Sequence, residues 1–379
     1  MKKNFWNNKK VFITGHTGFK GSWLTLWLKK LGADVSGYSL KPKKKSLFVD
    51  ANISNGIESN YENILNFRKL SNQIKKFSPE IVFHLAAQPL VKLSYNNPRK
   101  TYSTNIFGTI NLLESLKNCE SVKSIIIVTT DKVYENRQTR RGYNETDMLG
   151  GYDPYSSSKA CCEIITNSYR SSFFEKKGWS PGIATARAGN VIGGGDYSEF
   201  RLIPDIFKSI QNQKVLKIRN IKSIRPWQHV MEALKGYLKL AEQLYFNSEK
   251  FSEAWNFGPN KEGCKDVGWV LSQFRKNWNF SISHVQQNNV YESEMLKLDI
   301  SKAMKELKWK PILSLNEAIH LTSEWYRKKF SGEYSENILL DQINLYEQKY
   351  MESITDEYSE NILCDQINSY EQEYMESLR

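Results

Sequence analysis

The sequence predicts an α/β protein built on a doubly wound parallel sheet, with a smaller C-terminal α/β part and a helical tail. Short apolar runs alternate with amphipathic stretches over the first half of the 379 residues. The runs are apolar on consecutive positions rather than alternating, which is typical of strands that helices cover on both faces. The predicted strands are Val11–Thr14, Asp34–Tyr38, Ile81–Leu85, Ser124–Thr129 and Ile183–Arg187.

Helical patterns lie between these strands and end beside glycine or proline. They cover Gly18–Leu31, which is followed by Gly32, then Ile64–Phe77, which ends before Pro79, and Ile106–Leu116. The repeated order of strand and helix predicts crossovers within one parallel sheet.

The chain divides into three parts on this pattern. Residues 1–190 form the predicted sheet domain, with returning segments from about residues 225–260. Residues 191–330, where glycine and proline mark loops, are predicted to form mainly the substrate-binding part. Residues 331–379 form an acidic helical tail.

The tail is a tandem duplication. Glu333–Ser353 recurs as Glu357–Ser377 with a period of 24, and 18 of 21 positions are identical. Apolar and tyrosine side chains recur at helical spacing in both copies, and a shift of 24 residues turns this stripe to another face of a straight helix. We therefore expect two helices that are broken near Ser353–Asp356 and have a structural role.

The net charge of +12 is distributed unevenly. The tail holds 12 acidic and 2 basic residues, so residues 1–330 carry a net charge of +22. No basic stripe with interleaved aromatic residues accompanies this surplus, which argues against nucleic acid as a partner. The surplus reflects lysine-rich surfaces, and it suits a polyanionic small molecule such as a nucleotide.

The apolar and cysteine patterns predict a cytoplasmic location. No apolar run reaches membrane-spanning length, and no signal-peptide segment follows Met1. The five cysteines show no paired spacing, which predicts reduced thiols without a disulfide frame or a metal site.

A glycine-rich turn joins the first predicted strand to the first helix with the spacing G-x-x-G-x-x-G. Gly15 and Gly18 allow the backbone to approach a pyrophosphate at the positive end of the helix, and Gly21 allows close packing of helix and strand. We predict a dinucleotide-binding loop whose members are Gly15, Thr17, Gly18, Phe19, Lys20 and Gly21. The acidic residue that would bind the adenosine ribose is missing after the second strand, where Ser39 and Lys41 stand, so NADP stays open as an alternative to NAD.

Tyr155 and Lys159 are four residues apart and share one face of the helix predicted after Pro154. A phenol with a pKa near ~10 is a weak base at neutral pH, and a neighbouring cation favours its phenolate. Beside a dinucleotide loop, this pair predicts removal of an alcohol proton during hydride transfer.

Thr130, Asp131 and Lys132 follow a predicted strand at its C-terminal end, where ligands meet a doubly wound sheet. Thr130 offers a hydroxyl to the substrate. Asp131 and Lys132 supply one group that can donate a proton and another that can accept one. This pair favours an elimination over a plain epimerisation, which needs no proton donor for a leaving hydroxyl.

Five segments resemble CDP-glucose 4,6-dehydratase, a family of the extended short-chain dehydrogenase/reductases. The resemblance covers roughly residues 5–330 and leaves the duplicated tail outside. Other nucleotide-sugar dehydratases commonly carry Asp-Glu at the position of Asp131 and Lys132. The segments are Gly15–Trp23, Thr130–Asn136, Tyr155–Lys159, Arg187–Asp196 and Arg225–Val230, of which the first and last are the most distinctive.

The resemblance implies a Rossmann-type domain with bound NAD. It also implies a homodimer or a higher homo-oligomer, the dimer being formed through a helical bundle that contains Tyr155. It implies conversion of CDP-glucose to CDP-4-keto-6-deoxyglucose and water, for deoxysugars of surface polysaccharides such as the lipopolysaccharide O-antigen. In the implied mechanism, Tyr155 removes the O4 proton while NAD⁺ takes the C4 hydride. Lys132 then removes the C5 proton or stabilises the enolate, and Asp131 protonates the leaving C6 hydroxyl. After water has left, the hydride returns to C6.

The resemblance also implies binding residues. Asn63 stands where the family usually has a carboxylate near adenine, which predicts loss of NAD during purification. The cofactor set is completed by Leu85, Ala86, Ala87, Asn105, Tyr155 and Lys159. The implied substrate-binding residues are Gln88, Asn190, Arg201, Arg219 and Arg225.

Two alternatives stay open. One is a nucleotide-sugar epimerase or a 4,6-dehydratase that acts on a different nucleotide sugar. The other is a dinucleotide-sensing protein that has lost catalysis, which the intact Tyr155 and Lys159 disfavour.

Overall fold

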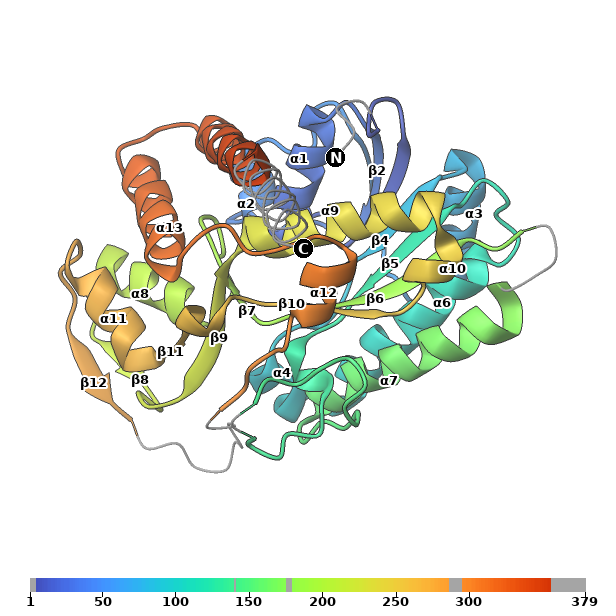
Figure 1. Cartoon of the computed structure of the whole chain (residues 1–379). Helices are drawn as coiled ribbons and strands as arrows, with labels where there is room; N and C mark the ends of the chain where they lie inside the picture. The colour runs from blue at the N-terminus through green and yellow to red at the C-terminus, as the bar shows by residue number, and fades with distance from the viewer. Residues whose placement is uncertain (1–4, 140, 175–178, 286–294, 356–379) are drawn as a thin grey trace, which may run out of the picture.

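The computed structural model describes residues 5–139, 141–174, 179–285 and 295–355 (Figure 1). Its centre is a seven-stranded sheet in the order β10-β6-β5-β4-β1-β2-β3. Every pairing within this sheet is parallel. The strands are β1 Lys10–Thr14, β2 Asp34–Ser39, β3 Glu58–Tyr61, β4 Ile81–His84, β5 Ser124–Val128, β6 Gly182–Ala188 and β10 Ala254–Phe257.

The predicted fold class and all five predicted strands are confirmed. β3 was not predicted, because its sequence Glu-Ser-Asn-Tyr contains no aliphatic residue and the strand lies partly exposed at the edge of the sheet. The chain order reverses between β1 and β4, which lie side by side. A switch of this kind opens a crevice at the C-terminal ends of the strands, where ligands bind.

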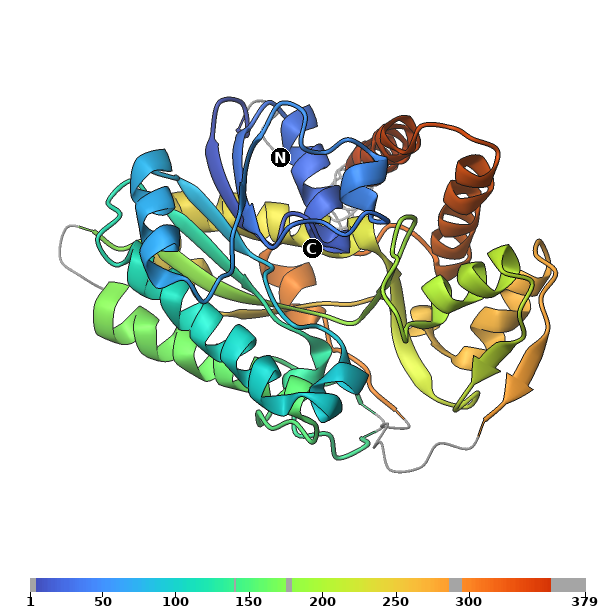
Figure 2. The ribbon, with the colours of Figure 1, turned by 180° about the vertical axis from the view of Figure 1, so that it is seen from behind.

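Helices cover both faces of the sheet (Figures 1 and 2). One face carries α1 and α9, and the other carries three helices whose apolar stripes form a second core. α3 is an example of such an apolar stripe, because its buried residues Leu70, Ile74 and Phe77 lie at helical spacing. The bounds are α1 Phe19–Lys30, α3 Phe67–Phe77, α6 Gly108–Leu116, α7 Pro154–Tyr169 and α9 Val230–Phe246.

A smaller part stands beyond the C-terminal ends of the sheet strands. It contains one three-stranded sheet in the order β11-β9-β7 and one two-stranded sheet formed by β12 and β8. The predicted boundary near residue 190, between the sheet domain and the substrate-binding part, stays a prediction. The bounds are β7 Asn190–Ile192, β8 Leu216–Ile218, β9 Ile224–His229, β11 Cys264–Asp266, β12 Ile282–His284, α8 Leu202–Gln211 and α11 Val267–Arg275.

Short helices connect these layers, and one longer helix precedes the tail. They are α2 Leu47–Asp50, α4 Val91–Asn96, α5 Pro98–Tyr102, α10 Ser248–Phe251, α12 Ser301–Glu306 and α13 Leu315–Phe330, with single turns η1 Ser103–Phe107, η2 Asp131–Val133, η3 Arg170–Phe174 and η4 Lys261–Gly263.

The first tail copy is helical over residues 335–355 and packs against the body (Figure 1). The side chains predicted to form its stripe are buried, with the exception of Tyr334, which is exposed. A break was predicted near Ser353–Asp356, but the helix continues through Ser353–Thr355. Asp356 and the second copy lie outside the described residues. The buried members of the stripe are Ile338, Leu339, Ile343, Tyr346 and Tyr350.

Candidate active site

The glycine turn closes against the neighbouring strands. Gly15 has a φ of +79°, and a Cβ there would lie 2.7 Å from the backbone nitrogen of Ala86. A Cβ on Gly21 would lie 2.1 Å from the Gly15 carbonyl oxygen. Both glycines are therefore required by packing. Gly18, the N-cap of α1, is exposed. A Cβ built on Gly18 would have one neighbour within 4 Å, the Gly15 carbonyl oxygen at 3.3 Å.

Hydroxyl groups stand where a carboxylate would bind a ribose. The Thr17 hydroxyl lies 2.8 Å from that of Ser39 at the end of β2, and it donates to the Leu40 carbonyl at 3.1 Å. Asn63 is exposed, and its side-chain oxygen accepts a hydrogen bond from the backbone of Leu65 at 3.0 Å. Asn63 therefore shapes the turn that follows β3.

Asn105 ties the segment after β4 to α7. Its side-chain oxygen accepts from the Gln88 backbone at 2.8 Å, and its amide donates to the Ser158 hydroxyl at 2.8 Å. Leu85 and Ala86 lie next to Gly15. The structure thus places Asn105 between the glycine turn and the helix that carries Tyr155 and Lys159.

α7 begins at a complete N-cap. The Asp153 carboxylate accepts from the backbone nitrogens of Tyr155 at 2.9 Å and Ser156 at 3.0 Å, and Pro154 occupies the first turn. This cap fixes Tyr155 in the first turn of the helix. The Lys159 ammonium, one turn later, is buried and donates to the Val128 carbonyl at 2.7 Å.

Thr130, Asp131 and Lys132 form a compact polar group directly after β5. Oδ1 of Asp131 accepts from the Thr130 hydroxyl at 2.9 Å and pairs with Lys132 Nζ at 2.9 Å. Asp131 is fully buried, and its Oδ2 has no partner within the described part of the chain. Lys132 Nζ also reaches Oδ1 of Asn190 at 3.5 Å.

Tyr155 is joined to this group by a side-chain hydrogen bond with Thr130. Burial raises the pKa of Tyr155 to about 12, whereas the Thr130 hydrogen bond and the Arg201 charge act to lower it. The sequence predicted that Lys159 would favour the phenolate. In the structure, the Lys159 ammonium is engaged with Val128, and Thr130 and Arg201 are the groups that lower the pKa of Tyr155.

A buried ion pair connects the two segments that carry the predicted catalytic residues. Arg187 donates from Nη2 and Nε to the Glu163 carboxylate at 2.9 and 3.0 Å, and both side chains are almost fully buried. The Glu163 carboxylate also accepts from the hydroxyls of Thr129 and Thr185. Because Glu163 lies one turn after Lys159, the pair connects α7 to β5 and β6.

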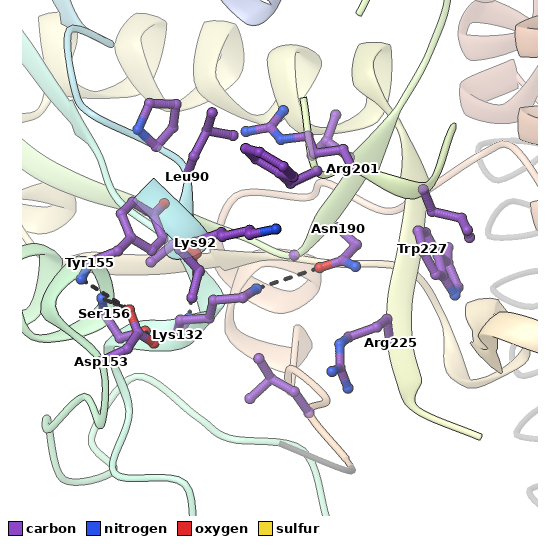
Figure 3. A pocket seen from close by; sticks show the side chains of 18 of the residues that line it. Leu90, Lys92, Lys132, Asp153, Tyr155, Ser156, Asn190, Arg201, Arg225 and Trp227 are labelled. Atoms are coloured by element: carbon purple, nitrogen blue, oxygen red, sulfur yellow. Dashed lines mark hydrogen bonds between the residues drawn. The ribbon is translucent and has the colours of Figure 1, made fainter. Parts of the chain in front are cut away.

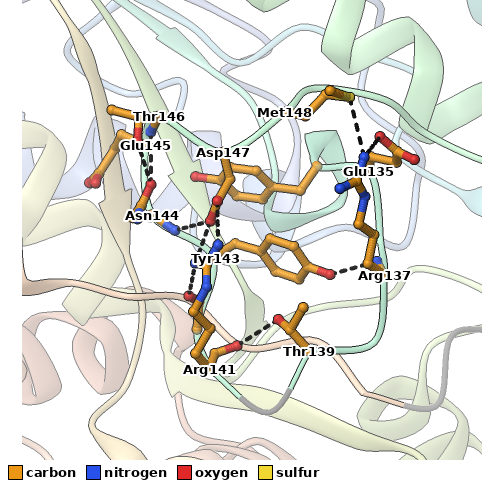
Figure 4. Close-up of polar contacts among 12 residues, drawn as sticks. Glu135, Arg137, Thr139, Arg141, Tyr143, Asn144, Glu145, Thr146, Asp147 and Met148 are labelled. Carbon is orange, nitrogen blue, oxygen red and sulfur yellow. Dashed lines mark hydrogen bonds and ion pairs between the residues drawn. The ribbon is translucent and has the colours of Figure 1, made fainter.

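Arg187 extends this network to the loop after Lys132. Its Nη1 donates at 2.8 Å to the Tyr134 hydroxyl, which in turn donates to Asn256 at 2.7 Å. Tyr134 stacks on Tyr143 with ring centroids 5.1 Å apart. Figure 4 shows Tyr143 inside this loop, which the ion pair of Arg141 and Asp147 closes.

A cavity of about 760 Å³ opens above these residues, a size that suits a nucleotide-sized ligand. Figure 3 shows Tyr155 and Lys132 on one side of it and Arg225 and Trp227 on the other. β7 and β9 form the far wall, because Asn190 pairs with Trp227 in parallel register. The lining cations are Lys20, Lys92, Lys132, Arg201, Lys217, Arg219 and Arg225.

The structure brings together most of the residues predicted to bind substrate. Asn190, Arg201, Arg219 and Arg225 line the cavity, and Arg201 pairs with Asp196 at 3.1 Å. Gln88 does not line it, because its amide bonds to Thr101 at 2.9 Å and to the Leu90 carbonyl at 3.2 Å. The predicted role of Gln88 in substrate binding therefore stays a prediction.

Sequence reasoning missed the contact between Lys92 and Phe200. The Lys92 ammonium lies 4.3 Å from the centroid of the Phe200 ring, and both residues line the cavity. Phe200 has a φ of +62°, an uncommon conformation for an aromatic residue. No local pattern marks either residue, since α4 and the loop before α8 meet only in the folded chain.

Lys20 was predicted to bind the cofactor, and in the structure it lines the same cavity. Its ammonium lies 3.3 Å from the Tyr237 hydroxyl. Burial lowers the pKa of Lys20 to about 7, and the nearby cation of Arg201 acts in the same direction. Lys20 thus connects the glycine turn to the group around Tyr155.

These observations define a class of protein, the short-chain dehydrogenases of the extended type. The chain has the glycine turn and the Tyr-Lys pair of this class, and its smaller part, which contains β7 and β9, forms one wall of the cavity. Comparison with known proteins identifies the family. The sequence profile described as GDP-mannose 4,6 dehydratase matches residues 12–322, and the chain belongs to this family.

Individual relatives agree with this assignment. The chain is 48% identical over 339 residues to the CDP-glucose 4,6-dehydratase of Salmonella typhimurium, covering 88% of this chain and 94% of that protein. It is 28% identical to the human dTDP-D-glucose 4,6-dehydratase, over 85% of this chain and 91% of that protein. The predicted resemblance to CDP-glucose 4,6-dehydratases is thus confirmed.

Solved structures show the same fold. The dTDP-glucose 4,6-dehydratase of Bacillus anthracis in complex with NAD superimposes with a TM-score of 0.72 at 22% identity, covering 86% of this chain and 98% of that one. The UDP-glucose 4-epimerase of Thermotoga maritima with UDP-glucose gives 0.71 at 22% identity, covering 84% and 99%. No helix in the described part of the chain is long and apolar enough to span a membrane.

Proposed function

We propose that the protein is an NAD-dependent CDP-glucose 4,6-dehydratase, which converts CDP-glucose to CDP-4-keto-6-deoxyglucose and water. The observation that carries this proposal is the Thr130–Asp131–Lys132 group next to Tyr155 at one end of a cation-lined cavity. The relative that is 48% identical supports the choice of CDP-glucose, because the relatives named for dTDP- and UDP-glucose share 33% or less.

The residues of the glycine turn fit a dinucleotide. Gly18 is exposed at the N-terminus of α1 and carries no side chain, so the backbone there is open to a pyrophosphate. Asn63, Leu85, Ala86, Ala87 and Asn105 complete the proposed cofactor site, together with Thr17, Phe19 and Lys20. NAD supplies a hydride acceptor for C4 of the sugar and a hydride donor for C6. Asn63 stands in place of a carboxylate near adenine, so we expect the purified protein to lose NAD readily. A stoichiometric amount retained after purification would contradict this.

Tyr155 is the proposed base for the O4 proton. Its hydrogen bond with Thr130 holds the phenol beside the substrate hydroxyl, and Arg201 favours the phenolate. Lys159, whose buried ammonium bonds to the Val128 carbonyl at the end of β5, is proposed to hold α7 and Tyr155 in place. Asn190, Arg219 and Arg225 are proposed to bind the nucleotide diphosphate, since arginine matches phosphate geometry.

Asp131 and Lys132 are proposed to carry the elimination. Once C4 is a ketone, the C5 proton is acidic, and Lys132 in its neutral form removes it. Asp131, protonated, donates to the departing C6 hydroxyl. Its Oδ2 is the oxygen available for that proton, because Oδ1 already accepts from Thr130 and Lys132.

Lys132→Ala tests the base role. We expect exchange of the C5 hydrogen with solvent deuterium to slow by about 10²–10⁴-fold, which is the usual contribution of a positioned base. Deuterium uptake is measured by mass spectrometry, with Lys92→Ala as a control that removes another cation of the cavity. Exchange at the normal rate in Lys132→Ala would rule out the base role of Lys132.

A substrate panel tests the function as a whole. The protein is incubated with NAD⁺ and CDP-, dTDP-, UDP- or GDP-glucose, and loss of water is followed by mass spectrometry. We expect loss of water from CDP-glucose. Loss of water from another nucleotide sugar alone would change the nucleobase assigned to the substrate. Loss of water from none of them would overturn the proposal.

We also propose a homodimer and a cytoplasmic location. Ile164 on α7 is 59% exposed and Phe107, just before α6, is 58% exposed, so two neighbouring helices present large apolar side chains to solvent. The cysteines of the described residues, Cys119, Cys161, Cys162 and Cys264, are free thiols, which suits a reducing compartment.

A further inference from the structure

The first tail copy binds the body through specific polar contacts as well as apolar packing. The Tyr346 hydroxyl donates to the Glu232 carboxylate of α9 at 2.8 Å, and its ring meets Trp27 of α1 edge-on with centroids 5.6 Å apart. The Trp27 indole donates to Glu347 at 2.8 Å. On α13, the Leu321 carbonyl accepts from Gln342 at 2.8 Å. The repeat-binding face therefore consists of α1, α9 and α13.

The second copy carries the same contact residues one period later. Gln366, Tyr370 and Glu371 correspond to Gln342, Tyr346 and Glu347. The apolar set is repeated as well, because Ile338, Leu339, Ile343 and Tyr350 correspond to Ile362, Leu363, Ile367 and Tyr374. Every described contact named above can thus be made by either copy.

The three differences between the copies lie at the margin of the interface, and two of them favour the first copy. Lys349 forms an ion pair with Glu317 of α13, and its counterpart Glu373 would place two carboxylates together. Leu340 packs against the core, and its counterpart Cys364 is smaller. The third difference replaces the exposed Leu345 by serine.

The connection to the body permits either copy to bind. Gly332 has a φ of +94°, and no atom lies within 4 Å of a Cβ built there, so the junction is not locked by packing. Binding of the second copy leaves residues 333–356 as a loop. The entropic cost of closing a loop grows only slowly with its length, so this exchange is accessible.

We propose that the face formed by α1, α9 and α13 is a binding site for the repeat sequence, and that residues 357–377 compete for it with residues 333–353 of the same chain. The enzyme body thus holds one repeat at a time. The first copy is preferred through Lys349 and Leu340, and the second is a lower-affinity ligand of the same site.

A deletion of one period tests whether the second copy can bind. A chain that lacks residues 333–356 joins Gly332 directly to the second copy. A chain ending at Asp356 should melt at a higher temperature than a chain ending at Gly332. We expect the deletion variant to keep most of this increase in melting temperature. Hydrogen exchange should show the same protection of α1 and α9. Unfolding like the chain ending at Gly332, or failure to fold where the chain ending at Asp356 folds, would overturn the proposal.

A charge exchange in the full chain tests competition. The variant Leu340→Ala, Lys349→Glu, Glu373→Lys moves the cation to the second copy and keeps the total charge. We expect alkylation of Cys364 to slow several-fold relative to the unaltered chain, with Cys264 as an internal reference and Leu340→Ala alone as the matched control. An unchanged rate of Cys364 alkylation in the triple variant would overturn the competition.

Discussion

Asp131 combines complete burial with an uneven use of its two oxygens. Oδ1 accepts from Thr130 and Lys132, whereas Oδ2 has no partner within the described residues. A buried polar atom without a partner is costly, and such atoms persist where a function requires them. The proposed substrate hydroxyl would supply the missing partner.

Asp131→Asn tests this role with little change of shape. We expect C4 oxidation to continue, because Tyr155 is untouched, while loss of water slows by about 10²–10⁴-fold. Reduced nicotinamide should therefore accumulate during a single turnover, which absorbance measures. Loss of C4 oxidation together with dehydration would instead indicate a structural role, and Glu135→Gln in the neighbouring loop serves as control.

Thr130→Val tests the control of the Tyr155 pKa. Burial raises that pKa to about 12, and the hydrogen bond with Thr130 lowers it. The active form is the phenolate, so kcat/KM rises with pH below the pKa. Removal of the hydrogen bond raises the pKa, and we expect the rising limb of the kcat/KM profile to move to higher pH. An unmoved limb would contradict this assignment.

At the level of elements, the Glu163–Arg187 pair joins three of them. Glu163 lies on α7, Arg187 on β6, and the Thr129 hydroxyl at the end of β5 bonds to the same carboxylate. Burial of two charges is tolerated because the Glu163 carboxylate accepts four hydrogen bonds and the Arg187 guanidinium donates four. The proposed catalytic groups on α7 and after β5 are thereby held by one hydrogen-bonded network.

Glu163→Gln should lower the free energy of unfolding by about 3–5 kcal/mol, because it leaves the buried Arg187 charge without its counterion. Denaturant unfolding measures this loss. The double variant Glu163→Met, Arg187→Met should recover much of it, since no charge is then left unpaired. A double variant as unstable as the single one would contradict the explanation.

The elements that could be predicted from sequence are those with local signals. The apolar strands, the glycine turn and the helix after Pro154 each have one, and the Tyr155–Lys159 pair needs only helical spacing. The edge strand β3 has no apolar pattern. Two contacts depend on which distant segments meet, and no local pattern encodes this. They are the contact of Lys92 with Phe200 and the ion pair of Arg187 with Glu163.

On the scale of the whole molecule, Glu232 links the body to the tail. Its carboxylate accepts from the backbone nitrogen of Ile312 at 2.9 Å and from Leu313 at 2.6 Å, besides the Tyr346 hydroxyl. Burial raises its pKa from the ordinary 4.5 to about 7. The folded protein therefore holds this proton more tightly than the unfolded chain does.

Glu232→Gln tests this linkage. The pKa of Glu232 is higher in the folded protein than in the unfolded chain. The contribution of Glu232 to the stability of the protein is therefore greatest below about pH 4.5 and is lost as the pH rises toward and through 7. We expect the melting temperature of the unaltered protein to decrease over that range more steeply than that of Glu232→Gln. Parallel curves for the two proteins would show that Glu232 does not titrate in this window.

The junction at Gly332 has a consequence for how the gene can change. The residues that follow it read Glu-Tyr-Ser whether the first or the second copy comes next. Deletion or insertion of one 24-residue period at this junction therefore leaves the rest of the amino-acid sequence unchanged. The number of repeats can thus be altered without changing any residue before Gly332.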